Sequence, residues 1–146
     1  MRELFFVDVE AEWGKPSPFS GRMTEFACVT YPSRFTFERY DDSSESLGDF
    51  SLWVTSITNR ERATFVSDNP AYDWQWINYY FDKYGIKNPF GYSARRIGDF
   101  YAGLVGDFGR ANEWKKLRVT PHTHKAIDDV MGNVEAFERL LAGERP

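Results

Sequence analysis

The stretch ELFFVDVEA, residues 3–11, joins a short apolar run to two carboxylates. Its aromatic and β-branched residues predict a buried strand over residues 3–9. Asp8 and Glu10 lie two positions apart, so a strand directs both side chains to the same face. At a separation of ~4 Å and an effective dielectric of 20 they repel by about 4 kcal/mol, and a divalent cation that binds both removes this penalty. The alternative is a solvent-exposed strand end.

Further along the chain, short apolar runs give way to segments of helical periodicity. Apolar and alternating patterns predict strands at 26–31, 34–40 and 63–66, with room for a short fifth strand after a loop at 88–92. Apolar spacing predicts helices at 46–58, 72–84, 97–108 and 125–142. Residues 109–123 are basic, and we expect them to have no regular secondary structure. This order of elements indicates an α/β or α+β fold.

The composition is that of a globular protein, with 42% hydrophobic and 27% charged residues. A length of 146 residues predicts one domain, spanning residues 1–146. No apolar run approaches the ~20 residues of a membrane-spanning helix, so no membrane partner is expected. Cys28 is the single cysteine, which excludes an internal disulfide framework and predicts a reducing, cytoplasmic setting.

A third carboxylate follows a predicted strand in SDNPAYDWQ, residues 67–75. Pro70 is suited to start the next helix, which puts Asp73 in the first turn, where the helix dipole favours an anion. This electrostatic role alone accounts for Asp73. Asp68 or Asn69 is suited to cap the same helix.

The segment HTHKAIDD, residues 122–129, opens the last predicted helix. His124 precedes the helix, and Asp129 follows it five positions later. Small helical neighbours such as Gly132 leave Asp129 an uncrowded face, which a carboxylate needs if it is to approach a metal ion. The alternative is a C-terminal helix with an acidic first turn, capped by Thr123.

In this order, the three segments resemble the three exonuclease motifs of the DEDDh family of 3′–5′ exonucleases. That family includes ribonuclease T, oligoribonuclease and polymerase proofreading subunits. The matching residues are 4–11, 67–76 and 122–133, and TEFACV at 24–29 resembles the family's second strand. The resemblance implies a ribonuclease-H-like α/β fold, with a mixed five-stranded sheet flanked by helices.

The resemblance also implies a role for each matching residue. It implies a general base, His124, and four catalytic, metal-binding carboxylates, Asp8, Glu10, Asp73 and Asp129. Four carboxylates without a Cys/His cluster favour two Mg²⁺ or Mn²⁺ ions over Zn²⁺. Two such ions serve both the attacking and the leaving oxygen in phosphodiester hydrolysis.

Several features depart from the family pattern. Ala11 stands where the family often has Thr, so only its backbone amide is expected to contact the terminal sugar of the substrate. His122 does not fit the spacing, because Ile127 lies five positions after it, and it is interpreted as structural or as a phosphate contact. The short stretch between Glu10 and Asp73 predicts a shallow, open site.

The chain has a formal net charge of −4, whereas a protein that binds nucleic acid by charge alone is expected to be basic. Two divalent ions would offset that charge. Residues 110–125 carry five Lys and Arg residues against the single acid Glu113. We expect this segment to line the path of the substrate backbone through Lys116, Arg118 and Lys125, and a solvated loop is the alternative.

Aromatic residues make up 18% of the chain, and they can fill a core or stack on bases. Trp13 lies in the loop after the first motif, where we expect it to stack on the terminal base of the substrate. Trp74 is the second candidate for this role. Trp74 and Trp76 cannot share one helix face with Asp73, so one of the two is expected in the core.

These observations predict a metal-dependent 3′–5′ exonuclease that releases nucleoside 5′-monophosphates from single-stranded nucleic acid. RNA is favoured over DNA by analogy with short members of the family, and a homodimer is expected on the same ground. One alternative is a non-catalytic module of the same fold that binds single-stranded ends. Another is an aromatic-rich protein-interaction domain.

Overall fold

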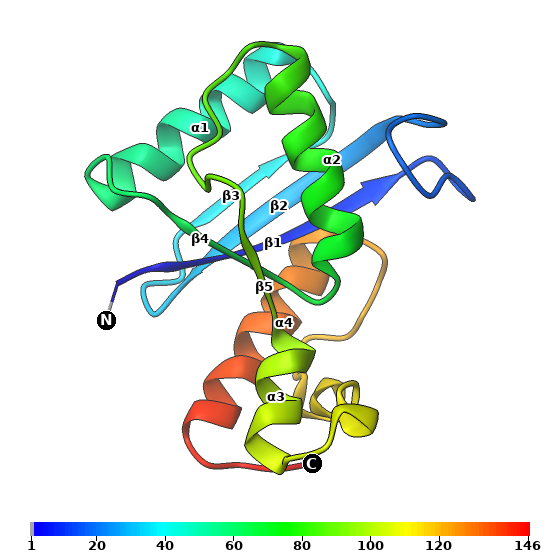
Figure 1. Ribbon diagram of the computed structural model, residues 1–146, viewed down its shortest axis with the longest axis vertical. Coiled ribbons are helices and arrows are strands. Elements are labelled where there is room, and N and C mark those ends of the chain that lie inside the picture. The colour runs from blue at the N-terminus through cyan, green and yellow to red at the C-terminus, as the bar shows by residue number, and fades with distance from the viewer. Residues whose placement is uncertain (1) are drawn as a thin grey trace.

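The computed structural model describes residues 2–146 and contains one mixed five-stranded sheet in the order β3-β2-β1-β4-β5 (Figure 1). The strands are β1 (Leu4–Ala11), β2 (Met23–Tyr31), β3 (Thr36–Arg39), β4 (Thr64–Ser67) and β5 (Ala94–Arg96). The central strand β1 pairs antiparallel with β2 and parallel with β4. The carboxyl ends of β1 and β4 therefore lie at the same edge of the sheet, where ligand sites of α/β folds are usually found.

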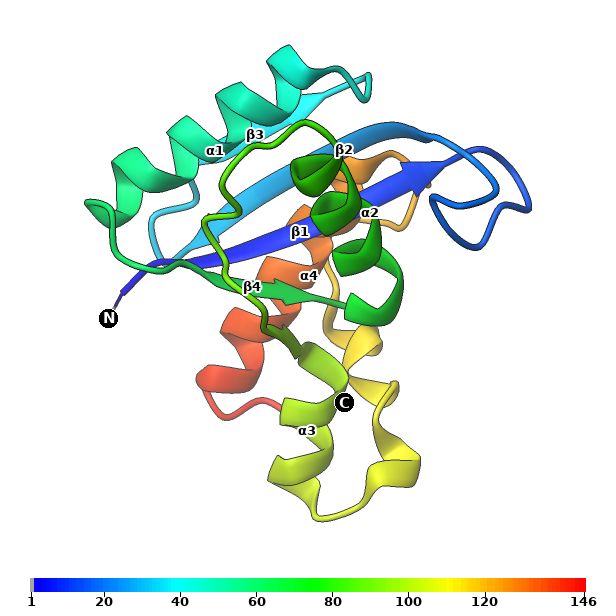
Figure 2. The ribbon, with the colours of Figure 1, turned by 45° about the horizontal axis from the view of Figure 1, so that its top comes forward.

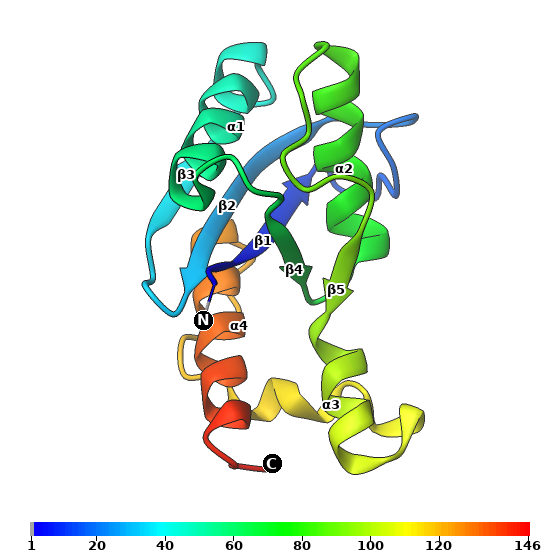
Figure 3. The same cartoon turned by 60° about the vertical axis from the view of Figure 1, so that its left-hand side comes forward.

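Helices cover both faces of this sheet. They are α1 (Ser44–Thr58), α2 (Pro70–Lys83), α3 (Ile97–Val105), α4 (Ala126–Leu141) and the short 3₁₀ helices η1 (Phe108–Arg110) and η2 (Glu113–Leu117). The helices α1 and α2 lie on one face and α4 crosses the other (Figures 1 and 2). The edge strand β5 runs directly into α3 (Figure 3). Within residues 2–146, no helix combines the length and the apolar content needed to span a membrane.

The alternation of side chains along β1 divides the core into two clusters. Phe5, Val7 and Val9 pack with buried residues of α1 and α2, whereas Phe6 packs with buried residues of α4. Fully burying a side chain of this size stabilises the fold by roughly 1.5–3 kcal/mol. Because side chains two positions apart share a face, this register turns Asp8 and Glu10 toward the side of α4.

The fold class expected from the motifs is confirmed, including the fifth strand, which has only three residues. Three helix boundaries differ from the predictions by two or three residues. The helix α1 begins at Ser44, two positions before its predicted start. Pro70 is the first residue of α2, two positions before the predicted start, and α3 ends at Val105 because Gly106 adopts a left-handed conformation with φ of 74°. The segment 109–123, predicted to be irregular, contains the 3₁₀ helix η2.

Candidate active site

Three carboxylates from distant parts of the chain meet where β1 ends and α4 begins. Asp8, Glu10 and Asp129 each offer an oxygen, and these atoms all lie within 4.8 Å of one another. The loop before α4 lies close to the helix at Gly132, where a Cβ atom would come within 2.8 Å of the Thr120 carbonyl oxygen. Glycine is therefore needed at this position for the loop to lie against the start of α4.

Burial and mutual repulsion disfavour the charged forms of these acids. The pKa of Asp8 lies well above its usual value, first because the carboxyl is buried and then because the charges of Asp73, Glu10 and Asp129 surround it. Burial, followed by the charge of Asp129, raises the pKa of Glu10 to about 7. Within the part of the chain that the structure describes, Asp8 Oδ2 and Asp129 Oδ2 are buried without a hydrogen-bond partner.

These unpartnered oxygens fit a bound cation. A buried carboxylate oxygen without a donor is costly, and a cation that binds it removes the cost. The donors are all carboxylate oxygens, which suits a hard ion such as Mg²⁺ or Mn²⁺. The residues present therefore match the metal group that the motifs imply.

Asp73, the fourth predicted ligand, lies beside this group and not within it. It is buried in the first turn of α2, and its Oδ1 accepts a hydrogen bond of 3.0 Å from the Val9 backbone N–H. The charge of Asp73 adds to burial in raising the pKa of Asp8. Burial raises the pKa of Asp73 itself to about 8. Asn69 is the N-cap residue of α2, but its side chain makes no capping hydrogen bond.

A fifth acid, Glu25, joins the edge of the cluster. It lies directly opposite Glu10 in the antiparallel pair of β1 and β2, and burial raises the pKa of its carboxyl. Glu25 has no signature in the sequence, because its place opposite Glu10 depends on the strand register. The stretch TEFACV was recognised as a strand, but that alone does not fix the register.

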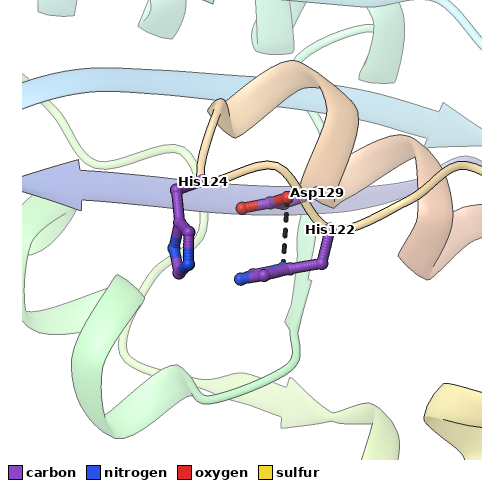
Figure 4. Close-up of side chains that lie close together, drawn as sticks. All are labelled: His122, His124 and Asp129. Carbon is purple, nitrogen blue, oxygen red and sulfur yellow. Dashed lines mark ion pairs between the residues drawn. The ribbon is translucent and has the colours of Figure 1, made fainter.

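The loop before α4 brings both histidines to Asp129. His122 Nδ1 lies 3.1 Å from Asp129 Oδ1, and the same oxygen accepts a 2.9 Å hydrogen bond from the Thr123 backbone N–H. The rings of His122 and His124 pack edge to face, with centroids 4.4 Å apart (Figure 4). His124 is exposed and has a left-handed backbone, with φ of 62°.

His122 was not expected at this position, since the motif spacing selected His124 alone. The one available signal was the short spacing His-x-His, which keeps both rings in the loop before α4. The expected cap Thr123 is wrong, because Lys125 occupies the N-cap position of α4 and no side chain caps it. The Thr123 hydroxyl donates instead to Asp128 Oδ2, at 2.9 Å.

The basic segment is partly neutralised by contacts within the protein. Lys115 Nζ and Arg118 Nη2 lie 3.1 and 3.5 Å from Asp68 Oδ2. Arg118 also donates two hydrogen bonds to Asn133 Oδ1 and lies over the ring of Trp114. Its side chain is only 15% exposed. This arrangement makes Arg118 a link between η2, α4 and the end of β4, so it does not support the expected substrate contact.

The other two predicted basic contacts are more accessible. Lys116 is exposed and makes no ion pair with any of residues 2–146. Lys125 is exposed as well, with its Nζ 6.0 Å from the centroid of the Tyr40 ring. Both side chains can therefore reach a phosphate outside the molecule.

The tryptophans divide between solvent and core. Trp13 is 98% exposed in the loop between β1 and β2, two residues after Ala11 at the irregular end of β1. Trp76 is wholly buried, as expected for one of the pair. Trp74 packs edge to face on Phe65, with centroids 5.2 Å apart, and joins the α1/α2 cluster. Trp74 is thus engaged in packing, which leaves the exposed Trp13 as the candidate for base stacking.

The chain is similar in sequence to a bacterial exonuclease. No family model matches the chain. The chain is 35% identical to the 3′-5′ DNA exonuclease Cap18 of Escherichia coli in an alignment of 107 residues. The match covers 68% of this chain and 56% of Cap18. The chain thus spans little more than half the length of that relative.

Solved structures share the fold at low sequence identity. The nuclease domain of 3′hExo, described as a DEDDh family member bound to rAMP, superposes with a TM-score of 0.67 and 16% identity, covering 99% of this chain and 97% of that one. A zinc-bound form of Escherichia coli ExoI with single-stranded DNA gives a TM-score of 0.65 and 14% identity, covering 98% and 41%. By its sequence match and its fold, the chain belongs to the DEDDh-type 3′–5′ exonuclease family.

Proposed function

We propose that this protein is a divalent-metal-dependent 3′–5′ exonuclease that acts on single-stranded 3′ ends and releases nucleoside 5′-monophosphates. The observation that carries the proposal is the meeting of Asp8, Glu10 and Asp129, two of them with buried oxygens that lack partners, beside an exposed His124. A structural role does not account for such a cluster, because unneutralised buried carboxylates destabilise a fold.

The four carboxylates are proposed to hold two Mg²⁺ or Mn²⁺ ions. When bound, such ions neutralise charge on the scissile phosphate and lower the pKa of the attacking water. Asp129 joins the cluster from α4, and Asp73 holds the end of β1 through the Val9 amide. The contact of Asp73 ties the end of β1, which carries Asp8 and Glu10, to the first turn of α2.

His124 is proposed as the general base. Its exposed imidazole can accept a proton from the attacking water and then release it to solvent. The imidazole of His124 lies near Asp129 but does not belong to the group formed by Asp8, Glu10 and Asp129. Proton transfer by His124 and cation binding by the acids are thus assigned to different groups.

The substrate strand is proposed to run from the β1–β2 loop across the start of α4. Trp13 offers a free ring for the terminal base, where stacking contributes roughly 1–3 kcal/mol. The backbone amide of Ala11 is proposed to contact the terminal sugar, and Lys116 and Lys125 are proposed to contact the phosphates. Because Trp13 stacks without hydrogen bonds to base edges, little sequence preference is expected.

DNA is the first candidate for the strand, because Cap18 is named a DNA exonuclease and matches this chain at 35% identity. RNA, which the analogy with short family members favoured, is the second candidate. The fold neighbour 3′hExo, which is bound to rAMP, keeps that candidate open. A cytoplasmic setting, a homodimer and a single domain over residues 1–146 stay predictions.

The test uses DNA and RNA oligonucleotides of one sequence, labelled at the 5′ end, with Mg²⁺, Mn²⁺ or EDTA. We expect a ladder that shortens from the 3′ end only with metal and is abolished in Asp8→Asn. Asp128→Asn is the matched control, because Asp128 neighbours Asp129 but stands outside the three-carboxylate group. Binding without cleavage in every metal would instead identify a non-catalytic module that binds strand ends.

A further inference from the structure

Two imidazoles and a carboxylate form a second group of ligand atoms at the start of α4. The ligand atoms of His122, His124 and Asp129 all lie within 4.8 Å of one another, and both rings reach into the space beside Asp129 (Figure 4). We propose that this trio is a second metal site, which shares Asp129 with the carboxylate group and takes a borderline transition-metal ion, Zn²⁺ above all.

The spacing of the trio already suits such an ion. A tetrahedral zinc site with bonds of about 2.0–2.1 Å places neighbouring ligand atoms about 3.3 Å apart. His122 Nδ1 and Asp129 Oδ1 are 3.1 Å apart, so one edge of the tetrahedron is present. The exposed His124 ring has room to turn toward them. In the metal-bound site, His122 binds through Nδ1 as a neutral ring that carries its proton on Nε2.

Donor chemistry separates this site from the all-carboxylate group. Imidazole nitrogen favours Zn²⁺, Co²⁺ and Ni²⁺, whereas Mg²⁺ prefers oxygen. The chain has two histidines, and both belong to the trio. The single thiol, that of Cys28, is wholly buried, and burial raises its pKa. Histidine-dependent binding of a transition-metal ion is therefore assignable to this trio.

The site has a consequence that rests on the proposed function. An ion held here engages Asp129, a ligand of the carboxylate group, and His124, the general base. Zn²⁺ should therefore inhibit hydrolysis even when Mg²⁺ is in large excess, because Mg²⁺ does not compete for imidazole nitrogens. Inhibition by Zn²⁺ should require His122, which no step of the proposed hydrolysis uses.

The binding test uses the untagged chain and Co²⁺ as a spectroscopic probe in millimolar Mg²⁺. We expect the visible absorption of four-coordinate Co²⁺, displaced by Zn²⁺, with an affinity that falls about tenfold or more in His122→Asn. Asp128→Asn is the control, because it removes a neighbouring charge but no proposed ligand, and its Co²⁺ affinity should change far less. Equal Co²⁺ affinity in wild type and His122→Asn, or equal loss in both variants, overturns the site.

The activity test compares the Zn²⁺ concentration that halves each variant's own uninhibited rate. In His122→Asn this concentration should rise about tenfold or more, in step with the weaker binding. If Co²⁺ binding depends on His122 but the protein does not shorten oligonucleotides, the metal site is supported and the proposed function is rejected. Strand shortening with Co²⁺ affinity unchanged by His122→Asn keeps the function and rejects the site.

Discussion

His124 and Asp129 lie side by side but differ in environment. Asp129 is 2% exposed and carries an unpartnered oxygen, whereas His124 is exposed on a left-handed backbone. This difference supports the proposal that Asp129 binds the hydrolytic metal ions while His124 transfers the proton. If so, a substitution at His124 should affect turnover without affecting Mn²⁺ binding.

The first prediction follows from this separation. In His124→Ala we expect turnover to fall roughly 10²–10⁴-fold, the usual contribution of a general base, while Mn²⁺ affinity stays within about threefold. Calorimetric titration with Mn²⁺ and initial rates on the same preparation measure the two effects. Asp129→Asn is the comparison, since it should lower both quantities. Equal loss of both in His124→Ala would assign His124 to structure.

For single residues, the sequence predicts the position of a side chain where local periodicity alone determines it. Asp8 and Glu10 share a face because they lie two apart in a strand. Contacts that depend on tertiary structure escaped prediction. Arg118 is held by Asn133 and Asp68, from other elements, and the face of α2 that turns Trp74 toward Phe65 is fixed by packing.

Arg118 and Lys116 provide the second prediction. Removal of the Arg118 contacts leaves Asn133, which is buried, without its donor, so Arg118→Ala should lower the free energy of unfolding by about 1–3 kcal/mol. Lys116→Ala should leave stability within about 0.5 kcal/mol and weaken strand binding, with a salt dependence reduced by about one ion. Urea unfolding and binding titrations over a salt series measure these effects. Lys116→Ala that lost stability and kept its affinity would refute this division.

The close contact of the loop before α4 with Gly132 acts at the scale of elements. The Thr120 carbonyl would lie 2.8 Å from a Cβ at this position, and the loop carries both histidines. The placement of His122 and His124 thus depends on a backbone contact between loop and helix. A residue with a side chain at 132 has to push the loop away from α4.

The third prediction tests that contact. Gly132→Ala should lower the free energy of unfolding by about 1–3 kcal/mol, the usual cost of overpacking, and weaken Mn²⁺ binding through displacement of Asp129. Gly103→Ala in α3 is the matched control, because a Cβ there meets nothing within 4 Å. Alanine at that helical position should raise stability by up to about 1 kcal/mol. If urea unfolding gave the two variants the same free energy of unfolding, the contact between the loop and Gly132 would not contribute to stability.

Elements were predictable in proportion to their length and periodicity. The helix α4, with 16 residues and an apolar face, lies within one residue of its predicted bounds. The strand β5 has three residues and is defined by pairing with β4, so its own pattern is too short to establish it. The 3₁₀ helix η2 buries Trp114 and Leu117 against the α4 side of the sheet, and that burial has no local signature.

At the scale of the whole molecule, the sheet separates an aromatic core from an acidic edge. Phe26, Phe37, Phe50 and Phe90 are among the buried rings on the α1/α2 face, and the carboxylates lie toward α4 where β1 ends. Packing on both faces positions the strands firmly enough to hold like charges together. The stability of the metal-free fold is therefore set partly by the protonation of its own site.

The last prediction concerns pH and metal together. Glu10 and Asp73 have a pKa of about 7 and about 8 in the folded chain, above their values of 4.5 and 3.8 outside it. Because the folded state holds these protons more tightly, their stabilising contribution is present in acid and is lost as pH rises toward 8. In EDTA, the free energy of unfolding should therefore fall between pH 5 and pH 8.

Divalent metal should reverse this trend, because it binds only the folded, ionised cluster. Saturating Mn²⁺ should stabilise the chain far more at pH 8 than at pH 5, as measured by urea unfolding at each pH. Asp73→Asn removes one of the repelling charges and should flatten the decline in EDTA. Asp49→Asn, an acid on α1 outside the cluster, should keep the wild-type slope. A metal-free chain whose stability is the same at pH 5 and pH 8 would mean that these carboxylates do not share one site.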